Sequence, residues 1–180
     1  GIYTVSLTVT NNIGCSDSVI KSNLITVDTV VVNFNSIGHC VGAPVNFSSV
    51  TTPPSVGVSW DFGDATTSNQ NNPIKIYASP GIYNVRLISN FGACIDSISK
   101  PITILPKPSI AFTQSNTSSC SLPLSVNFNN SSTGANNYQW SFGDGGNSTQ
   151  QNPIHIYNQF GTYSVVLVAI SDSGCVDSLK

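Results

Sequence analysis

The chain has 180 residues, a formal net charge of −2 and only 8% charged side chains. Its six Lys and Arg form no basic cluster that could follow a phosphate backbone, so we expect no nucleic-acid partner. A hydrophobic content of 39% supports a packed core, whereas every apolar run is too short to cross a bilayer. We therefore expect a folded protein with a neutral polar surface and no membrane span in this segment.

The first predicted element is a strand at the start of the chain. Tyr3, Val5, Leu7 and Val9 alternate with threonine and serine, which is the period of a half-buried strand. Further β-rich runs follow, each bounded by Gly, Pro, Asn or Ser, and no stretch has a sustained helical period. These runs are Val30–Asn35, Val45–Val50, Val56–Phe62 and Ile102–Leu105, and the alternation returns at Tyr163, Val165, Leu167 and Ala169.

The chain contains an internal repeat. The segment Trp60-Asp61-Phe62-Gly63-Asp64 recurs 80 positions later as Trp140-Ser141-Phe142-Gly143-Asp144. Gly81-Ile82-Tyr83 recurs as Gly161-Thr162-Tyr163 and also matches Gly1-Ile2-Tyr3, so the chain opens near the end of a further copy. A repeat sets the whole architecture and is therefore decisive for the fold.

The repeat predicts the domain organisation. Residues 1–27 are the last two strands of one copy, residues 28–105 are a complete copy, and residues 106–180 are a copy that lacks most of its last strand. Several short strands in about 80 residues are typical of an immunoglobulin-like sandwich. We expect an all-β chain of tandem antiparallel sandwiches arranged end to end, cut from a longer array, with Pro106-Lys107-Pro108 as a stiff linker.

The repeated residues resemble a known family signature. Trp60 to Asp64, then Asn72-Pro73, Tyr77 and Gly81 with Tyr83, are similar to the pattern of polycystic kidney disease (PKD) repeats. An early cysteine, as in Gly38-His39-Cys40, and a late Gly-Cys, as in Gly14-Cys15 and Gly174-Cys175, resemble the PKD arrays of very large surface proteins in gliding bacteria. This resemblance implies a stalk or filament segment of a secreted or cell-surface adhesin.

The repeated aromatic and acidic residues have two interpretations each. Trp60 and Trp140 are favoured as core residues over sugar-stacking platforms, because apolar residues lie two positions before them. Asp64 and Asp144 are favoured as turn formers over calcium ligands, because no ring of oxygen ligands accompanies them. We place Tyr83 and Tyr163 with the structural residues, and we expect no metal and no cofactor.

No catalytic constellation is visible. Asp61 is replaced by Ser141 in the next copy, and His155 is replaced by Lys75. His39 and Cys40 are adjacent, and on a strand they would point to opposite faces, so a thiol and base pair is disfavoured. We therefore predict a non-catalytic protein with no catalytic residue.

The five cysteines allow two pairing schemes. A seven-residue strand spans about 23 Å, so Cys40, after the first strand, and Cys94, between the last two, lie far apart. We therefore favour a bond between copies, Cys40 to Cys175, with partners outside this segment for Cys15, Cys94 and Cys120. The alternative, Cys40 to Cys94 and Cys120 to Cys175, stays open.

A short sequence pattern concerns modification. Asp followed by Ser or Thr and then an apolar residue or threonine resembles an O-glycosylation acceptor of the same gliding bacteria, and a plain strand start explains it equally well. The hydroxyls concerned are Ser18, Thr29, Ser97 and Ser178.

Two functions remain open. The main hypothesis is an extracellular adhesin stalk whose partners are neighbouring repeats of the same chain, with a surface polysaccharide or another cell-surface protein as a further partner. The alternative is an accessory module of a secreted enzyme that binds a polysaccharide or a protein.

Overall fold

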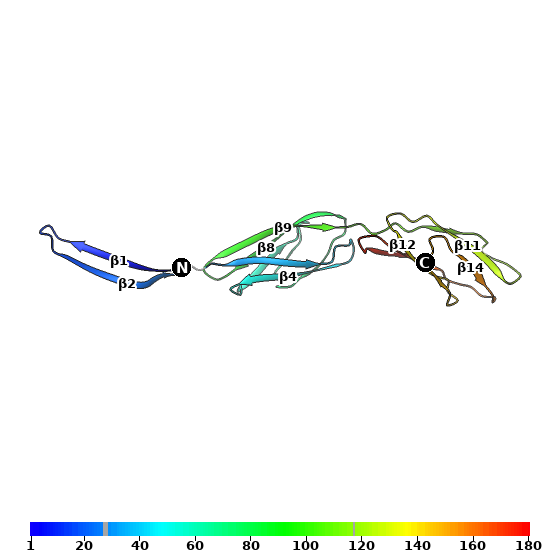
Figure 1. Ribbon diagram of the computed structural model, residues 1–180, viewed down its shortest axis with the longest axis horizontal. Helices are drawn as coiled ribbons and strands as arrows, with labels where there is room; N and C mark the ends of the chain where they lie inside the picture. Colours follow the sequence, from blue (N-terminus) through cyan, green and yellow to red (C-terminus); the bar gives the residue numbers. More distant parts are fainter. Residues whose placement is uncertain (27–28, 117) are drawn as a thin grey trace.

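We analysed a computed structural model, which describes residues 1–26, 29–116 and 118–180. In these residues the regular secondary structure is entirely β, which agrees with the all-β fold expected from the sequence. Figure 1 shows a hairpin, a first sandwich and a second sandwich following one another along the longest axis. No helix in the described part of the chain could span a membrane.

The first sandwich consists of two antiparallel sheets. One sheet has the order β3-β4-β7 and the other has the order β6-β5-β8-β9. Polar and apolar residues alternate along the central strands, so one side chain in two enters the core. The strands are β3 (Val31–Ile37), β4 (Pro44–Thr52), β5 (Gly57–Asp61), β6 (Thr67–Ser68), β7 (Ile74–Ile76), β8 (Gly81–Asn90) and β9 (Ile95–Ile104).

The second sandwich repeats this topology. Its sheets have the orders β10-β11-β14 and β13-β12-β15-β16. The strands are β10 (Phe112–Gln114), β11 (Leu124–Asn130), β12 (Asn137–Ser141), β13 (Asn147–Ser148), β14 (Ile154–Tyr157), β15 (Val166–Ile170) and β16 (Val176–Leu179). The equivalent order of strands shows that the sequence repeat is also a structural repeat.

The N-terminal hairpin is a two-stranded sheet of β1 (Ile2–Thr10) and β2 (Ser16–Thr26). Its alternating apolar side chains are exposed, with Tyr3 at 55% and Leu7 at 60%. These residues match the core-facing positions of β8, but no second sheet covers them in the described part of the chain. The predicted domain boundary at residues 27 and 28 lies outside the described residues.

The two tryptophans form the centres of the two cores. Trp60 is completely buried and Trp140 is 2% exposed, and each indole N–H donates to a backbone carbonyl, of Gln70 and Gln150. Phenylalanines pack around both rings at centroid distances of 5.1 to 6.4 Å. A sugar-stacking platform would need an exposed ring face, which neither tryptophan has.

The second sandwich differs from the first beside its last strand. The first half of β8, Gly81–Val85, pairs with Lys100–Ile104 of β9. β16 has four residues where β9 has ten, so residues 161–165 lack this partner, and β15 begins only at Val166. The alternation at Tyr163 and Val165 therefore predicted a longer strand than the structure contains.

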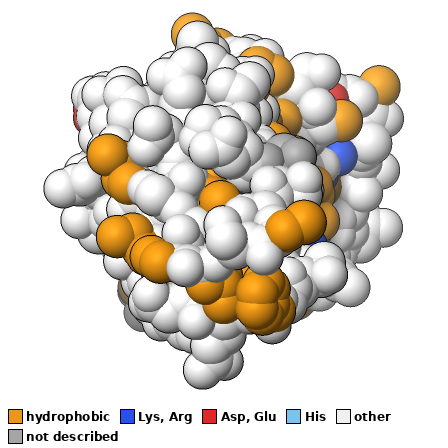
Figure 2. Space-filling view, turned by 90° about the vertical axis from the view of Figure 1, so that its right-hand side faces the viewer, with side chains coloured by type: hydrophobic (Ala, Val, Ile, Leu, Met, Phe, Trp, Pro, Cys, Tyr) orange, Lys and Arg blue, Asp and Glu red, His pale blue; other side chains and the backbone are white. Residues whose placement is uncertain are grey.

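An open groove of about 850 Å³ lies at this place, lined by core side chains such as Phe112, Leu124, Val126 and Tyr163. Figure 2 views the molecule from this end, and hydrophobic side chains lie there among polar atoms with few charges. In the first sandwich, Ile104 of β9 is 2% exposed and closes the equivalent part of the core. The groove is therefore the space that the second half of the last strand fills in a complete repeat.

The glycine of the repeated Phe-Gly-Asp turn is required by both its conformation and its surroundings. Gly63 has φ +76°, and a Cβ there would lie 2.9 Å from the backbone nitrogen of Asn84. We expect Gly63→Ala to lower the free energy of unfolding by about 3 kcal/mol. Gly92 has φ +86° with nothing within 4 Å, so Gly92→Ala should cost only about 1 kcal/mol. Urea unfolding measures both, and equal losses would contradict the role of close packing at Gly63.

Candidate functional site

The site with the most distinctive chemistry is the junction between the two sandwiches. Its first part is the loop after β3, where Gly38 has φ +103° and turns the chain. The loop is held against the end of the first repeat, because the N–H of Leu105 donates to the carbonyl of His39 and the N–H of Val41 donates to that of Leu105. Cys40 forms a parallel bridge with Leu105. These bonds fix Cys40 at the pole that faces the next repeat.

The second part of the junction is the turn between β15 and β16. The N–H of Gly174 donates to the carbonyl of Ser171, and the N–H of Cys175 donates to the hydroxyl of Ser171. Gly174 has φ +81°, which suits glycine at this point of the turn. Cys175 follows and has no exposed surface. The turn therefore presents the second cysteine at the pole of the second sandwich that faces the first.

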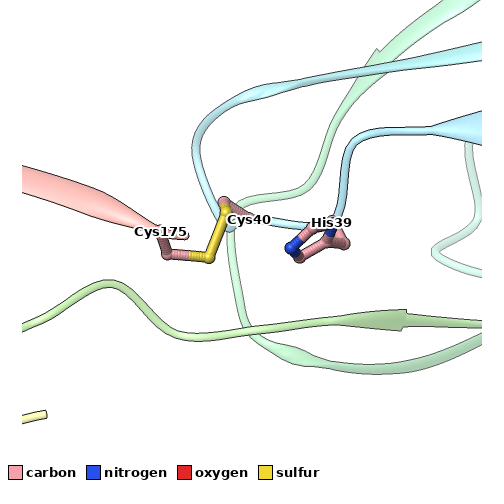
Figure 3. Close-up of side chains that lie close together, drawn as sticks. All are labelled: His39, Cys40 and Cys175. Carbon is pink, nitrogen blue, oxygen red and sulfur yellow. A yellow bond between two sulfur atoms is a disulfide. The ribbon is translucent and has the colours of Figure 1, made fainter. Parts of the chain in front are cut away.

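A disulfide joins these two parts. Cys40 and Cys175 are bonded with a Cα–Cα distance of 5.5 Å and lie 135 positions apart in sequence (Figure 3). This is the inter-repeat pairing that the strand geometry favoured, rather than a bond within each copy. Cys15, Cys94 and Cys120 are exposed free cysteines, and their pairing with partners outside this segment stays a prediction.

His39 adds a second contact across the junction. Its Nε2 lies 2.8 Å from the carbonyl oxygen of Ser173, in the turn that carries Cys175. We expected His39 and Cys40 to point to opposite faces of a strand, which is wrong, because both lie in the loop beyond β3. An imidazole nitrogen and both sulfurs lie within 4.8 Å of one another. Since the sulfurs are bonded to each other, they offer no thiolate to a metal in this state.

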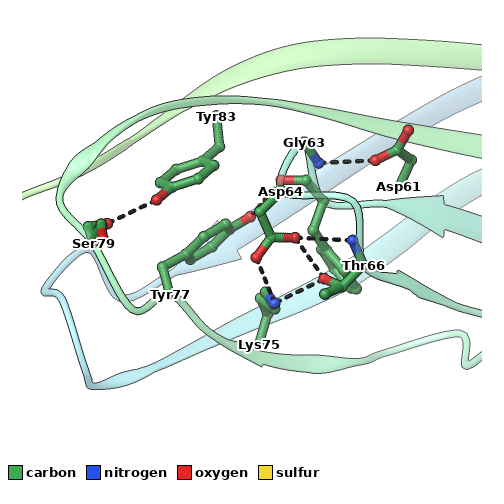
Figure 4. Close-up of polar contacts among 9 residues, drawn as sticks. Asp61, Gly63, Asp64, Thr66, Lys75, Tyr77, Ser79 and Tyr83 are labelled. Carbon is green, nitrogen blue, oxygen red and sulfur yellow. Dashed lines mark hydrogen bonds and ion pairs between the residues drawn. The ribbon is translucent and has the colours of Figure 1, made fainter.

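The repeated aspartates form a polar cluster at the Phe-Gly-Asp turn of each sandwich. The Oδ1 of Asp64 accepts hydrogen bonds from the N–H and the hydroxyl of Thr66, and its Oδ2 lies 2.7 Å from the Nζ of Lys75 (Figure 4). Asp144 likewise accepts from the N–H of Gly146 and lies 2.7 Å from the Nε2 of His155. The aspartates are therefore turn formers that also carry a nitrogen partner.

Sequence reasoning missed these partners. Lys75 and His155 occupy equivalent positions, each eleven residues after its aspartate, although the two residue types differ. Both side chains place a nitrogen at the carboxylate and both can carry a positive charge. The shared property was visible in the repeat alignment as a basic residue at the same position.

The partners shift the pKa of each carboxyl group. Partial burial raises the pKa of Asp64, but hydrogen bonds from Lys75 and Thr66 outweigh it and hold the pKa below its ordinary value. The hydrogen bond with His155 is the largest influence on Asp144 and lowers its pKa despite partial burial. Burial raises the pKa of Tyr77, whose hydroxyl donates to the carbonyl of Phe62 beneath this cluster.

A depressed carboxyl pKa predicts a pH-dependent contribution to stability. Asp144 binds fewer protons in the folded than in the unfolded protein, so its contribution is present above the unfolded pKa and is lost as pH falls through the folded pKa. We expect Asp144→Asn to lower the melting temperature at pH 7 and to have a progressively smaller effect as the pH falls into the acidic range. Thermal unfolding of both proteins from pH 7 to pH 2.5 checks this. An effect that is undiminished at low pH would show that the carboxylate charge is not responsible.

Tyr83 and Tyr163 close the corner before the next-to-last strand. The hydroxyl of Tyr83 donates to the carbonyl of Ser79, and that of Tyr163 donates to the carbonyl of Gln159. Each ring packs on the buried tyrosine of its repeat, with centroid distances of 4.2 Å to Tyr77 and 4.4 Å to Tyr157. This arrangement resembles the tyrosine corner of immunoglobulin-like sandwiches.

The fold and its junction define a tandem array of immunoglobulin-like sandwiches linked end to end. A family model described as the PKD domain matches residues 32–99 and again residues 105–180. The chain therefore belongs to the PKD domain family and contains two copies in tandem. PKD modules are typically non-catalytic.

Curated relatives match only short stretches. The collagenase ColQ1 of Bacillus cereus is 49% identical over 37 residues, which is 21% of this chain and 4% of that protein. The microbial collagenase of Vibrio alginolyticus is 46% identical over 61 residues, 32% of this chain and 7% of that protein. The chain thus spans less than a tenth of the length of these relatives.

Two solved structures, one bacterial and one from a bacteriophage, align with most of this chain. Fibronectin(III)-like modules of Clostridium thermocellum CbhA align with a TM-score of 0.42 and 16% identity, over 83% of this chain and 91% of theirs. Three N-terminal domains of the outer capsid protein Hoc of bacteriophage RB49 align with a TM-score of 0.38 and 13% identity, over 84% of this chain and 57% of theirs.

Proposed function

We propose that this chain is a non-catalytic extracellular spacer that holds the parts of a larger secreted protein at a fixed distance and orientation. The observation that supports this most is the Cys40 to Cys175 disulfide, which joins two sandwiches that the linker already connects. Two covalent connections between the same two bodies restrict their relative rotation far more than one. A disulfide also suits an oxidising, extracellular location.

Among the possible larger proteins, we favour a secreted enzyme. The matched relatives are collagenases, so an accessory role beside a catalytic domain has more support than an adhesin stalk. In that role the neutral surface with 8% charged residues would contact a fibrous protein or a polysaccharide. Sedimentation of the 180-residue protein with insoluble collagen fibrils, and separately with cellulose, tests this binding. No depletion from the supernatant by either polymer would leave only the spacer role.

The adhesin stalk of a gliding bacterium remains the second candidate. It is supported by tandem repeats whose cysteines occupy equivalent positions, since Cys15, Cys94 and Cys175 each precede the last strand of a copy. If the same bond recurs along an array, Cys94 and Cys15 bond to earlier copies and Cys120 bonds to a later one. Non-reducing mass spectrometry of the whole natural protein would detect these links. Free thiols at all three positions would argue against this arrangement.

O-glycosylation is a further proposal for the natural protein. Ser18, Thr29 and Ser178 are exposed, whereas Ser97 is half-buried and accepts a hydrogen bond from Arg86. The first three are therefore the better acceptors. Peptide mapping by mass spectrometry of the protein from its natural source should show hexose-sized additions on the peptides that contain these three residues, and unmodified peptide masses would reject the proposal.

Small-angle X-ray scattering tests the spacer function itself. The oxidised protein should give the narrow distance distribution of a single extended shape. In Cys40→Ser with Cys175→Ser, the junction keeps only the linker and the hydrogen-bonded loop, so the distribution should broaden towards shorter dimensions. Cys94→Ser is the matched control and should scatter like the original. Identical curves for all three proteins would show that the disulfide does not orient the repeats.

A further inference from the structure

We propose that the disulfide lets a stretching force bypass most of both sandwiches. The force would pass along the backbone of β3, through the Cys40 to Cys175 bond and along the backbone of β16, which together form an almost extended line. This inference rests on the proposed spacer function and adds a mechanical property to it. Residues 41–174 lie inside the covalent loop that the bond closes. A force applied to the two ends of the chain would then leave these residues unloaded.

In the first sandwich the force follows β3, which leads to Cys40. The parallel bridge between Cys40 and Leu105 places the end of β3 beside the end of β9, at the pole that faces the second sandwich. β3 (Val31–Ile37) follows the N-terminal hairpin and reaches this pole from the hairpin side of the sandwich (Figure 1). The strand therefore crosses the sandwich from pole to pole before the chain reaches Cys40. Strand backbone already rises about 3.3 Å per residue, so tension cannot lengthen it appreciably.

In the second sandwich the force follows β16. Cys175 is followed directly by β16, which pairs antiparallel with β15 and runs away from the junction. β16 is also extended backbone. Force transmitted by the sulfur atoms therefore continues along Val176–Leu179 without passing through the other strands of that sandwich.

Without the bond, the force would follow a different path. The chain would then carry force from β3 through every later strand, the linker and the second sandwich. Each sandwich would be pulled between its first and last strands and could unfold and lengthen. The bond removes this possibility, because lengthening of residues 41–174 would require breaking a covalent bond between two sulfur atoms.

The amount of chain protected in this way is large. The cysteines are 135 positions apart, so 134 residues lie between them. At about 3.5 Å for each extended residue, they represent about 470 Å of contour length. The hairpin of β1 and β2 lies outside the loop, so it should unzip in either state.

Single-molecule force spectroscopy with handles at Gly1 and Lys180 tests the inference. The exposed Cys15, Cys94 and Cys120 are replaced by serine, so that only the bond of interest can form. The oxidised protein should lengthen only by the hairpin and short flanking segments. After reduction by a dithiol, which is oxidised to its own disulfide while each cysteine sulfur gains a proton, the total contour length should increase by about 470 Å.

The comparison uses one protein in two redox states, so any effect of the three serine replacements is the same in both states. Cys40→Ser with Cys175→Ser should behave as the reduced protein in both conditions. Equal total lengths before and after reduction would overturn the inference. Broad scattering from the oxidised protein together with the 470 Å difference would instead reject the rigid spacer while leaving the protected path intact.

Discussion

Simultaneous replacement of Cys40 and Cys175 by serine is expected to lower the free energy of unfolding of the oxidised protein by about 4 kcal/mol. The bond closes a loop of more than 100 residues, and such a cross-link restricts the unfolded chain strongly. It also joins two folded bodies, so its loss should make their unfolding more independent. Urea unfolding followed by circular dichroism measures the change.

Two single variants serve as controls for this result. Cys94 and Cys120 are exposed and unbonded, so Cys94→Ser and Cys120→Ser should change the free energy of unfolding by less than about 0.5 kcal/mol. A similar loss in all three proteins would show that the effect comes from cysteine replacement in general. No loss in the double variant would mean that the bond contributes nothing to the folded state.

Trp60→Ala should have an effect of comparable size within the first repeat. Trp60 has no exposed surface, and its ring contacts Phe34, Phe47 and Phe62. Its removal leaves a cavity and an unpaired carbonyl at Gln70, so we expect a loss of about 4 kcal/mol. Thermal unfolding by circular dichroism checks the loss, and Trp140→Ala should act in the same way on the second repeat.

An exposed residue of the same sandwich provides the control. Ile82 is 74% exposed on β8, so Ile82→Ala should change stability by no more than about 0.5 kcal/mol. A Trp60→Ala protein as stable as the original would contradict the central place of this ring in the core. The same result would reopen the interpretation of the tryptophan as a surface platform.

Much of the fold could be predicted because the repeat applies one pattern twice. Strands with a clear alternation, such as Val45–Val50 within β4, were predicted at the right place. The first half of β9 was missed, because its polar residues from Asp96 to Lys100 hide the period of two. That half pairs with β8 through its backbone along its whole length, so hydrogen bonding forms a strand that side-chain pattern alone does not indicate.

The junction was predictable in part. Strand length and direction were enough to favour a bond between copies, because they placed Cys40 and Cys94 at opposite poles. The contact of His39 with Ser173 was not predictable, since it depends on a loop conformation set by hydrogen bonds to Leu105. The partners of Asp64 and Asp144 were missed for a different reason, because lysine and histidine look dissimilar in sequence although both place a nitrogen at the same carboxylate.

Peptide mapping of the unreduced protein by mass spectrometry tests the covalent junction most directly. Trypsin would leave Cys94, Cys120 and Cys175 on one peptide, because Lys100 and Lys107 both precede proline, so chymotrypsin is the suitable protease. A peptide containing Cys40 linked to one containing Cys175 is the predicted result. Cys40 linked to Cys94, or Cys40 and Cys175 both recovered as free thiols, would contradict the disulfide between the two repeats and the spacer function built on it.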